Sequence, residues 1–302
     1  MADSTRAGRE EPATDPPLAP GLYLVATPIG NLEDITLRAL RVLRSADRIA
    51  CEDTRQTGKL LAHFGITTPT ISYHLHNERG RAEELVAQLR QAARIAVVSD
   101  AGTPSIADPG EAIVRAAVEA GVPVYAIPGA NAAVTALTAS GLLAERFTFR
   151  GFLPSKAGER RSALEQVLVE MRAAGIPATQ VFYETPHRIV DALADVAAVF
   201  GPAHRIALAR ELTKLHEEYL RGTAAEVQAC LAARDTVRGE MVLMLSGDVA
   251  TEAAAAQTLA AAVRARMAVG DVEKDAVKHV ARARGMGKSD AYREWQRTRG
   301  RG

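Results

Sequence analysis

Short apolar runs alternate with amphipathic segments along most of the chain, and this alternation limits the possible folds more than any other feature. We predict strands at residues 22–26, 48–51, 70–73, 95–99 and 124–127. The amphipathic segments between and after them, at 35–45, 57–64, 81–91 and 111–120, are predicted as helices. Strands joined through helices need crossover connections, which favour a largely parallel sheet. The sequence therefore predicts an α/β fold.

A second α/β set follows the first. Its predicted strands are residues 180–184, 205–210 and 240–245, and its predicted helices are 187–200 and 224–233. Residues 140–156 between the two sets are rich in Gly, Pro and aromatic residues and lose the helical period, so we predict a linker there. The expected organisation is a disordered tail (1–20), two α/β domains (21–139 and 157–249) and a helical, helix-turn-helix-like extension (250–302).

Positive charge is concentrated in that extension. The whole chain has a net charge of +1, whereas residues 264–302 hold eleven Lys or Arg and five Asp or Glu, a surplus of +6. A basic helical segment suits an RNA backbone, with Tyr292 or Trp295 available to stack on a base. A solvated appendage, a dimer contact and a small core around the two aromatic residues are the alternatives.

Several classes of protein do not fit the sequence. No stretch approaches the roughly 18 apolar residues of a membrane span, and the N-terminus lacks a charged-then-apolar signal pattern, so we expect a cytoplasmic protein. Cys51 and Cys230 lie far apart, which suggests neither a disulfide framework nor a zinc site. His74 and His76 lack further ligands at a fixed spacing, and no metal site is predicted.

Three predicted strands run into loops of small residues. TPIGNLEDIT follows the first strand, SDAGTPSIADPG begins at the end of the fourth, and PGANAAVTALTASG follows the fifth. Ligands bind at the carboxyl ends of strands in open α/β sheets, and small residues let the backbone approach a ligand closely. The phosphate-binding motifs GxxxxGK[ST] and GxGxxG are absent after any strand, which disfavours a nucleoside triphosphate or a dinucleotide.

Eight motifs occur in an order that resembles one family. They are TPIGNLEDIT, CEDTR, SDAGTPSIADPG, IPGANAAVTALTASGL, FRGFLPSK, FYETPHRI, ARELTKLHEE and RGEMV. The chain resembles the tetrapyrrole methylase family of S-adenosylmethionine-dependent methyltransferases. Members that methylate tetrapyrroles usually start the third motif with Gly-Asp-Pro, and this chain has Ser99-Asp100-Ala101-Gly102 instead. The resemblance is therefore to the branch that methylates a cytidine 2′-hydroxyl in the decoding region of small-subunit (16S) ribosomal RNA.

The resemblance implies a cofactor, a partner and a set of binding residues. It implies S-adenosylmethionine in a cleft between two α/β domains, usually within a homodimer, and ribosomal RNA or the assembled small subunit as substrate. In the first domain it assigns donor binding to Pro28, Ile29, Gly30, Asp100, Gly102, Thr103, Ile106, Asn131 and Ala132. In the second domain it assigns Tyr183, Ala209, Arg210 and Glu240.

Methyl transfer to a ribose also needs a group that takes the proton of a weakly nucleophilic hydroxyl. The charged residues of the matching motifs are Glu52, Asp53, Arg55, Glu184, His187, Arg188, Arg210, Glu211 and Lys214. We predict Asp53 and Glu184 as proton acceptors. Arg55, Arg188 and Lys214 are predicted to bind RNA phosphate or to lower the pKa of the hydroxyl. The alternative role for each residue is an ion pair at a domain interface or a contact with phosphate.

Two other functions stay open from the sequence. A methyltransferase acting on a tetrapyrrole or another small molecule would use the same donor loops. A ribosome-associated RNA-binding module without catalysis would tolerate damaged loops, and the loops here are intact. Three basic residues near the predicted linker suit contact with RNA, whether the chain methylates RNA or only binds it. They are Lys156, Arg160 and Arg161.

Overall fold

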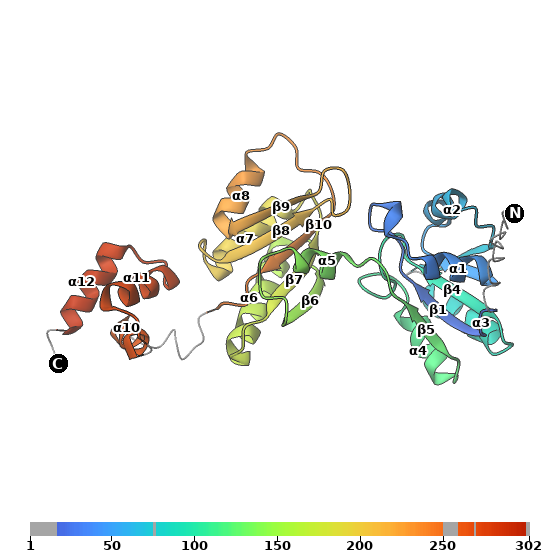
Figure 1. The fold of residues 1–302 in the computed structure, drawn as a ribbon, viewed down its shortest axis with the longest axis horizontal. Helices are drawn as coiled ribbons and strands as arrows, with labels where there is room; N and C mark the ends of the chain where they lie inside the picture. The colour runs from blue at the N-terminus through green and yellow to red at the C-terminus, as the bar shows by residue number, and fades with distance from the viewer. Residues whose placement is uncertain (1–16, 75–76, 250–258, 269, 300–302) are drawn as a thin grey trace, which may run out of the picture. The chain divides into compact units, whose positions relative to one another are not determined.

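The computed structural model describes residues 17–74, 77–249, 259–268 and 270–299. These residues form two compact units that divide between Asn131 and Ala132 (Figure 1). Residues 1–16 of the predicted tail and residues 250–258 of the predicted extension lie outside the described residues. None of the described helices is long and apolar enough to span a membrane.

The first unit contains a five-stranded parallel sheet, as the sequence predicts. Its strands are β1 (Gly21–Val25), β2 (Arg48–Cys51), β3 (Thr70–Ser72), β4 (Arg94–Val98) and β5 (Val124–Ile127), in the order β3-β2-β4-β1-β5. Its helices are η1 (Leu32–Asp34), α1 (Leu37–Ser45), α2 (Thr54–His63), α3 (Glu78–Leu89) and α4 (Glu111–Glu119). Helices α1 and α2 pack on one face of the sheet, and α3 and α4 pack on the other.

Burial on both faces explains why these strands are short and apolar. Along β1, Leu22 packs in the core under α3 and α4, whereas Tyr23 and Val25 pack in the core under α1 and α2. Neighbouring residues of a strand point to opposite faces, so a sheet covered on both sides needs apolar residues at every position. Because all five strands run parallel, their carboxyl ends meet at one edge of the sheet.

The second unit has a mixed sheet. Its strands are β6 (Phe147–Phe152), β7 (Thr179–Glu184), β8 (Arg205–Arg210), β9 (Glu218–Thr223) and β10 (Met241–Leu245), in the order β6-β7-β10-β8-β9. Only β6 and β7 pair in parallel, and the other pairs are antiparallel. Helices α6 (Ala157–Ala174), α7 (Ile189–Phe200) and α8 (Ala224–Ala232) share one core with the sheet, and α5 (Ala132–Thr138) contacts β7 and β10.

Several features of the second unit differ from the sequence expectation, among them the 18-residue helix α6, which was not predicted. Strand β6 forms inside the stretch 140–156 that we expected to be a linker, and β9 was not predicted. Both strands lie at the edges of the sheet and are only partly buried, so neither shows a clear apolar pattern. Helix α5 lies before the expected domain boundary at residue 139 but packs on the second sheet, because its apolar side faces β7 and β10.

Among the described residues of the predicted helical extension are the helices α10 (Leu259–Ala268), α11 (Glu273–Ala283) and α12 (Lys288–Arg299). They share a small core in which the side chain of Trp295 is buried. The indole Nε1–H of Trp295 donates to Glu273 Oε1 at 2.9 Å, and Tyr292 packs against the same core. Trp295 is therefore a structural residue of the extension, and the expectation that it is available to stack on a base is wrong.

Candidate active site

The loops that follow β1 and β4 are joined by a short backbone bridge. The amide of Thr27 donates to the carbonyl of Gly102 at 2.9 Å, and the amide of Gly102 donates to the carbonyl of Thr27 at 3.0 Å. The Thr27 hydroxyl also donates to the carbonyl of Ser99 at 3.2 Å. Two of the three predicted donor loops thus form one backbone-lined surface at the carboxyl edge of the first sheet.

The loop that follows β5 is tied to the same surface. The Thr103 hydroxyl donates to the carbonyl of Ala130 at 3.0 Å, and the Asn131 amide donates to the Thr103 hydroxyl at 3.5 Å. Gly102 has a φ of 83°, and a Cβ built there would lie 3.3 Å from Ile29 Cγ2 and 3.7 Å from the Ala130 carbonyl oxygen. The three loops therefore meet around a position that glycine fills with least strain.

The first-domain residues predicted to bind the donor gather at this edge, with one exception. Pro28, Ile29 and Gly102 are buried, Thr103 and Asn131 are half-buried, and Gly30, Asp100 and Ile106 are exposed. The exception, Ala132, begins α5 in the second unit.

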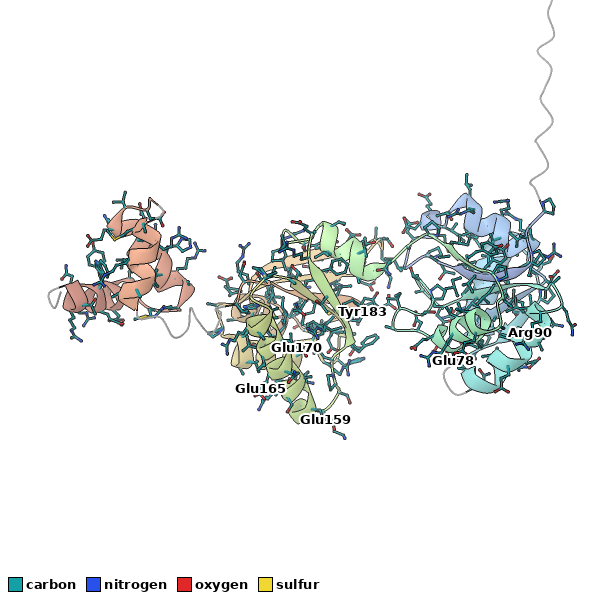
Figure 2. All side chains as sticks on the ribbon, turned by 90° about the horizontal axis from the view of Figure 1, so that it is seen from below. Glu78, Arg90, Glu159, Glu165, Glu170 and Tyr183 are labelled. Atoms are coloured by element: carbon teal, nitrogen blue, oxygen red, sulfur yellow. The ribbon has the colours of Figure 1, made fainter. Side chains whose placement is uncertain are left out.

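The long loop between β4 and α4 has a strained backbone and is held by hydrogen bonds to the carboxylate of Glu78. Ser105 and Ala107 adopt left-handed backbone conformations, with φ values of 70° and 64°. Such conformations cost of order 1 kcal/mol or more each and persist where the surroundings enforce them. Here Glu78 Oε1 accepts from the amide of Gly110 at 2.9 Å, and the Tyr73 hydroxyl donates to the same oxygen at 3.0 Å (Glu78 is labelled in Figure 2). The carboxylate of α3 thereby anchors the end of the loop.

Antiparallel pairing gathers the predicted second-domain residues at one edge of the second sheet. Met241 of β10 lies opposite Glu184 of β7 on one side and opposite Arg210 of β8 on the other. Val242 occupies the same central position in the next row. These two rows, with the residue before β10, bring together Tyr183, Glu184, Ala209, Arg210 and Glu240.

Lys214 lies between two carboxylates at this edge. Its Nζ donates to Glu211 Oε1 and to Glu240 Oε2, both at 2.9 Å. Although burial opposes the charge, these two hydrogen bonds raise the pKa of Lys214. The arrangement is tight, since a Cβ on Gly239 would lie 2.3 Å from Glu211 Cγ. Lys214 is therefore a permanently charged donor rather than a base.

Arg210 is used to hold the surrounding loops. Its Nε donates to Glu218 Oε2 at 3.0 Å, and its other nitrogens donate to the carbonyls of Arg238 and His216 at 3.1 and 3.4 Å. Arg234 binds both oxygens of Glu218. Hydrogen bonds from Arg234, and then from Arg210, lower the pKa of Glu218 to about 2 despite its partial burial. The predicted donor-binding residue Arg210 thus has a bracing role in this structure.

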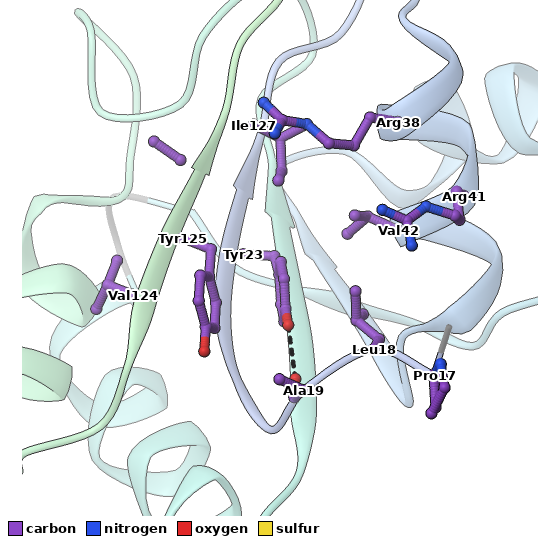
Figure 3. Close-up of a pocket in the computed structure, with 11 residues that line it drawn as sticks. Pro17, Leu18, Ala19, Tyr23, Arg38, Arg41, Val42, Val124, Tyr125 and Ile127 are labelled. Atoms are coloured by element: carbon purple, nitrogen blue, oxygen red, sulfur yellow. Dashed lines mark hydrogen bonds between the residues drawn. The ribbon is translucent and has the colours of Figure 1, made fainter. Parts of the chain in front are cut away.

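A cavity of about 450 Å³ lies elsewhere in the first unit, beside α1 and β5 (Figure 3). The rings of Tyr23 and Tyr125 stack in it with centroids 4.7 Å apart, and Arg38 and Arg41 of α1 line it. None of the residues predicted to bind the donor lines this cavity. The loops at the carboxyl edge, and not this cavity, define the candidate site.

Comparison with known proteins assigns the family. The sequence model of the family described as Tetrapyrrole (Corrin/Porphyrin) Methylases matches residues 21–228. The chain belongs to the tetrapyrrole methylases. It is 48% identical over 276 residues to "Ribosomal RNA small subunit methyltransferase I" of Halalkalibacterium halodurans, covering 90% of this chain and 93% of the relative. It is 49% identical over 232 residues to the protein of the same name from Escherichia coli O157:H7, covering 76% and 79%.

A solved structure shows the same fold in another tetrapyrrole methylase. The uroporphyrin-III-C-methyltransferase of Thermus thermophilus superposes with a TM-score of 0.50 at 21% identity, covering 74% of this chain and 93% of that one. Tetrapyrrole methylases take the methyl group from S-adenosylmethionine. The backbone cradle around Gly102 fits such a donor, since a side chain at that position would fill the space next to Ile29 and Ala130.

The predicted proton acceptor Asp53 lies at the carboxyl edge of the first sheet, and both of its carboxylate oxygens already accept hydrogen bonds from Arg55. Asp53 Oδ1 caps α2 by accepting from the amide of Arg55 at 2.8 Å, and Oδ2 accepts from the Arg55 side chain at 3.1 Å. Hydrogen bonding to Arg55 lowers the pKa of Asp53, which keeps the carboxylate ionised and makes it a weak base. The amide of Asp53 donates to Asp100 Oδ1 at 3.2 Å, so the loop after β2 is linked to the donor loops.

The second predicted acceptor, Glu184, is buried. Its Oε1 accepts from the amide of Thr185 at 2.7 Å and from two nitrogens of Arg188, at 2.8 and 2.6 Å. Within the described residues, its Oε2 has no hydrogen-bond partner. The side chain of Glu184 has no solvent-exposed surface, whereas 25% of the Arg188 side chain is exposed. Glu184 therefore positions Arg188 at the edge of the second sheet.

Sequence reasoning missed one carboxylate at the donor edge. Burial, and then the charge of Glu52, raise the pKa of Asp108 to about 6, against the opposing hydrogen bond with Ser99. Burial and the charge of Asp100 also raise the pKa of Glu52. A carboxylate with a pKa close to neutral is better matched to proton transfer than one held at low pKa. The available signal was the second Asp of SDAGTPSIADPG, whose burial depends on how the loop folds.

No metal-binding cluster is found in the part of the chain that the structure describes. No three His, Cys, Asp or Glu side chains among the described residues are placed to hold a metal ion. His76, one of the two histidines considered in the sequence, lies outside that part.

Proposed function

We propose that the chain transfers the methyl group of S-adenosylmethionine to the ribose 2′-hydroxyl of a cytidine in small-subunit (16S) ribosomal RNA. The observation that carries this proposal is the intact three-loop cradle in a chain 48% identical over 276 residues to a relative named for small-subunit ribosomal RNA methylation. We also propose that it acts as a homodimer in the cytoplasm, on ribosomal RNA or on the assembled small subunit.

The first unit supplies the donor-binding surface. When bound, S-adenosylmethionine supplies a methyl group on a positively charged sulfur, which is an excellent leaving group. The small residues around Gly102 leave room for close backbone contact, and the exposed carboxylate of Asp100 favours a cation nearby. Catalysis in such a displacement depends largely on positioning, which the loop bridges provide.

Carboxylates at the same edge are proposed to take the hydroxyl proton. S-adenosylmethionine would supply the methyl group, and a carboxylate at this edge would take the proton that the ribose hydroxyl loses. Asp53 is ionised but weakened as a base by Arg55, and Asp108 has the more suitable pKa of about 6. We therefore propose Asp108, in addition to Asp53, as a proton acceptor. Glu184 is proposed as a positioning residue for Arg188.

The remaining predicted residues are proposed to contact the substrates. Tyr183, Ala209, Arg210 and Glu240 stay proposed donor-binding residues, as does Ala132 at the start of α5. Arg55, Arg188 and Lys214 are proposed to bind RNA phosphate. Arg55 is the most exposed of these three cations, with 87% of its side chain exposed.

Methyl transfer with three acceptors tests the proposal. Labelled S-adenosylmethionine is incubated with the full chain and small ribosomal subunits, naked small-subunit RNA or a tetrapyrrole, and ribose methylation is mapped. The same reactions are run with Asp100→Ala and with the control Asp191→Ala, an exposed aspartate in the first turn of α7. We expect label in a cytidine 2′-oxygen with the wild type and Asp191→Ala, and strongly reduced label with Asp100→Ala.

The other acceptors give the contrary outcomes. Label in the tetrapyrrole alone would replace the RNA function with a small-molecule methyltransferase. RNA binding without any label, and without a response to the donor, would support the non-catalytic RNA-binding alternative. Label in RNA subunits but not in naked RNA would keep the function and identify the assembled particle as the substrate.

A further inference from the structure

Three aromatic rings cluster at the edge of the second sheet formed by β6. The ring centroids of Phe149 and Phe152 lie 4.9 and 5.6 Å from that of Tyr183, and both pairs are inclined at 65° (Tyr183 is labelled in Figure 2). These distances and angles are those of edge-to-face aromatic packing. Tyr183 belongs to the row that also holds Val242 and Ala209, and so lies at the edge already described.

A bulge in β6 is what brings the third ring to the cluster. The register between β6 and β7 shifts between Phe149 and Phe152, so Phe152 pairs with Tyr183 where a regular strand would place Gly151. Gly151 has a φ of 68°, a left-handed conformation that accommodates the extra residue. Without the bulge, Phe149 and Phe152 would face opposite sides of the sheet, because neighbouring side chains alternate.

Phe152 is nevertheless left exposed. Phe152 as a whole residue is 53% exposed, whereas the next residue, Leu153, is buried in the core of the unit. The bulge therefore presents an aromatic ring to solvent instead of burying it. Re-aiming a side chain is a common use of bulges near functional sites.

Positive charge follows this ring along the chain. Lys156 and Arg161, at and after the start of α6, have 78% and 60% of their side chains exposed. Lys156 pairs with the exposed Glu159, and an ion pair with this much exposure is weak and open to exchange. Arg161 shares the buried carboxylate of Asp195 with Arg160. An exposed aromatic ring followed by exposed cations is the combination by which proteins hold an unpaired base and its backbone.

We propose that Phe152, supported edge-to-face by Tyr183, is a stacking site for an unstacked base of the RNA substrate. This inference rests on the proposed function, and it names a binding site for a nucleobase on residues of the second unit. Ribose methylation within folded RNA requires a nucleotide turned out of its stack, and an aromatic ring compensates for part of the lost stacking.

The test compares two phenylalanines of the same strand. Phe152→Ala removes the proposed platform, Phe152→Trp preserves it, and Phe147→Ala is the matched control, since Phe147 is 42% exposed at the other end of β6. For each full-length variant we would measure the affinity for S-adenosylhomocysteine by calorimetry, the affinity for small-subunit RNA at several salt concentrations, and kcat/KM for methyl transfer.

We expect Phe152→Ala to lower RNA affinity about tenfold, within the range known for loss of base stacking. The salt dependence of RNA binding and the affinity for S-adenosylhomocysteine stay unchanged, and Phe152→Trp and Phe147→Ala remain within about threefold of wild type. A matching loss of S-adenosylhomocysteine affinity would place the ring at the donor instead. Equal RNA affinity for Phe152→Ala and Phe147→Ala would overturn the inference.

The RNA-binding measurement does not depend on catalysis. If the wild type methylates RNA ribose but Phe152→Ala binds RNA normally, only the stacking site is wrong. If the wild type binds no RNA and methylates only a tetrapyrrole, the proposed function is wrong and the stacking site with it. A change in sedimentation mass for Phe152→Ala would show that the ring packs against a second copy of the chain, which also contradicts the inference.

Discussion

The edge of each sheet that holds the predicted site residues is built differently, from loop backbone in the first sheet and from charged side chains in the second. In the first unit, the edge consists of loop backbone drawn together by the Thr27–Gly102 bridge and by left-handed residues. In the second unit, the edge consists of charged side chains in mutual ion pairs, such as Lys214 with Glu211 and Glu240. A backbone surface accepts a ligand by shape, whereas an ion-paired surface holds charges in fixed places.

The difference follows from strand direction. All strands of the first sheet are parallel, so every carboxyl end feeds a loop into the same edge. In the second sheet, antiparallel partners bring the start of β10 next to the ends of β7 and β8. Side chains far apart in sequence therefore become neighbours, and the edge is organised by register rather than by loop composition.

Removal of the buried carboxylate of the second edge is expected to have the largest effect. Glu184→Ala leaves Arg188 without its partner and should reduce stability by about 3 kcal/mol, the lower end for a broken buried pair because Arg188 is partly exposed. Urea denaturation measures the change. Glu159→Ala breaks the surface pair with Lys156 and should cost less than about 0.5 kcal/mol.

Glu184→Gln separates structure from catalysis at this position. The amide keeps an oxygen for the Thr185 amide and for Arg188, so the variant should fold. With a positioning role, kcat falls modestly and the pH–rate profile keeps its shape. A fall of 10² or more, together with loss of the acidic limb of the profile, would restore Glu184 as the proton acceptor.

A side chain in the backbone cradle is expected to have the next largest effect. Gly102→Ala places a Cβ 3.3 Å from Ile29 Cγ2 and should weaken S-adenosylmethionine binding about tenfold, equivalent to about 1.4 kcal/mol. Gly121→Ala is the matched control, because its φ of 69° is similarly left-handed and no atom lies within 4 Å of its Cβ. Calorimetry that gave equal donor affinities for the two variants would remove Gly102 from the donor site.

Substitution of Asp108 is expected to have the smallest effect on stability, with a distinctive pH dependence. Its pKa of about 6 lies above the value near 4 of an unfolded chain, so the folded protein holds this proton more tightly. Its contribution to stability is complete below pH 4 and is lost as the pH rises through 6. Asp108→Asn should therefore stabilise the protein at pH 7.5 by about 1 kcal/mol, a value reduced for partial exposure.

Thermal denaturation at two pH values checks this expectation. The advantage of Asp108→Asn at pH 7.5 should disappear at pH 4, where the wild-type carboxyl is protonated too. A constant advantage at both values would mean that the pKa of Asp108 is not raised. If Asp108 also accepts the proton, the same variant loses methyl transfer while retaining S-adenosylmethionine binding.

The positions of most helices and strands were predictable, because each depends on the pattern of apolar residues within its own segment. The strands of the first unit and the helices α7 and α8 were predicted within about two residues, since buried elements carry a strong apolar period. Strands β6 and β9 were missed because edge strands bury only part of their side chains. Residues 132–138 were expected in a loop of the first domain and instead form α5 in the second unit, because their contacts with β7 and β10 cannot be read from their own sequence.

Part of the candidate site was predictable from the sequence, and part of it depends on the tertiary structure. The loops around Gly102 were predictable, since small residues after parallel strands share one edge by topology. The raised pKa of Asp108 was not, because it arises from burial and from the charge of Glu52, which follows β2. The exposed ring of Phe152 was not predictable either, since it depends on a bulge that shifts one strand against its neighbour.

The sequence by itself determined the α/β class, the helical extension and the three small-residue loops, because periodicity and loop composition are properties of neighbouring residues. Only the tertiary structure decided which charges face one another. Antiparallel register brought Glu240 to Lys214, which also pairs with Glu211 three residues before it, and loop packing buried Asp108. Those outcomes depend on distances between residues far apart in the chain, which are fixed only when the sheets and their cores assemble.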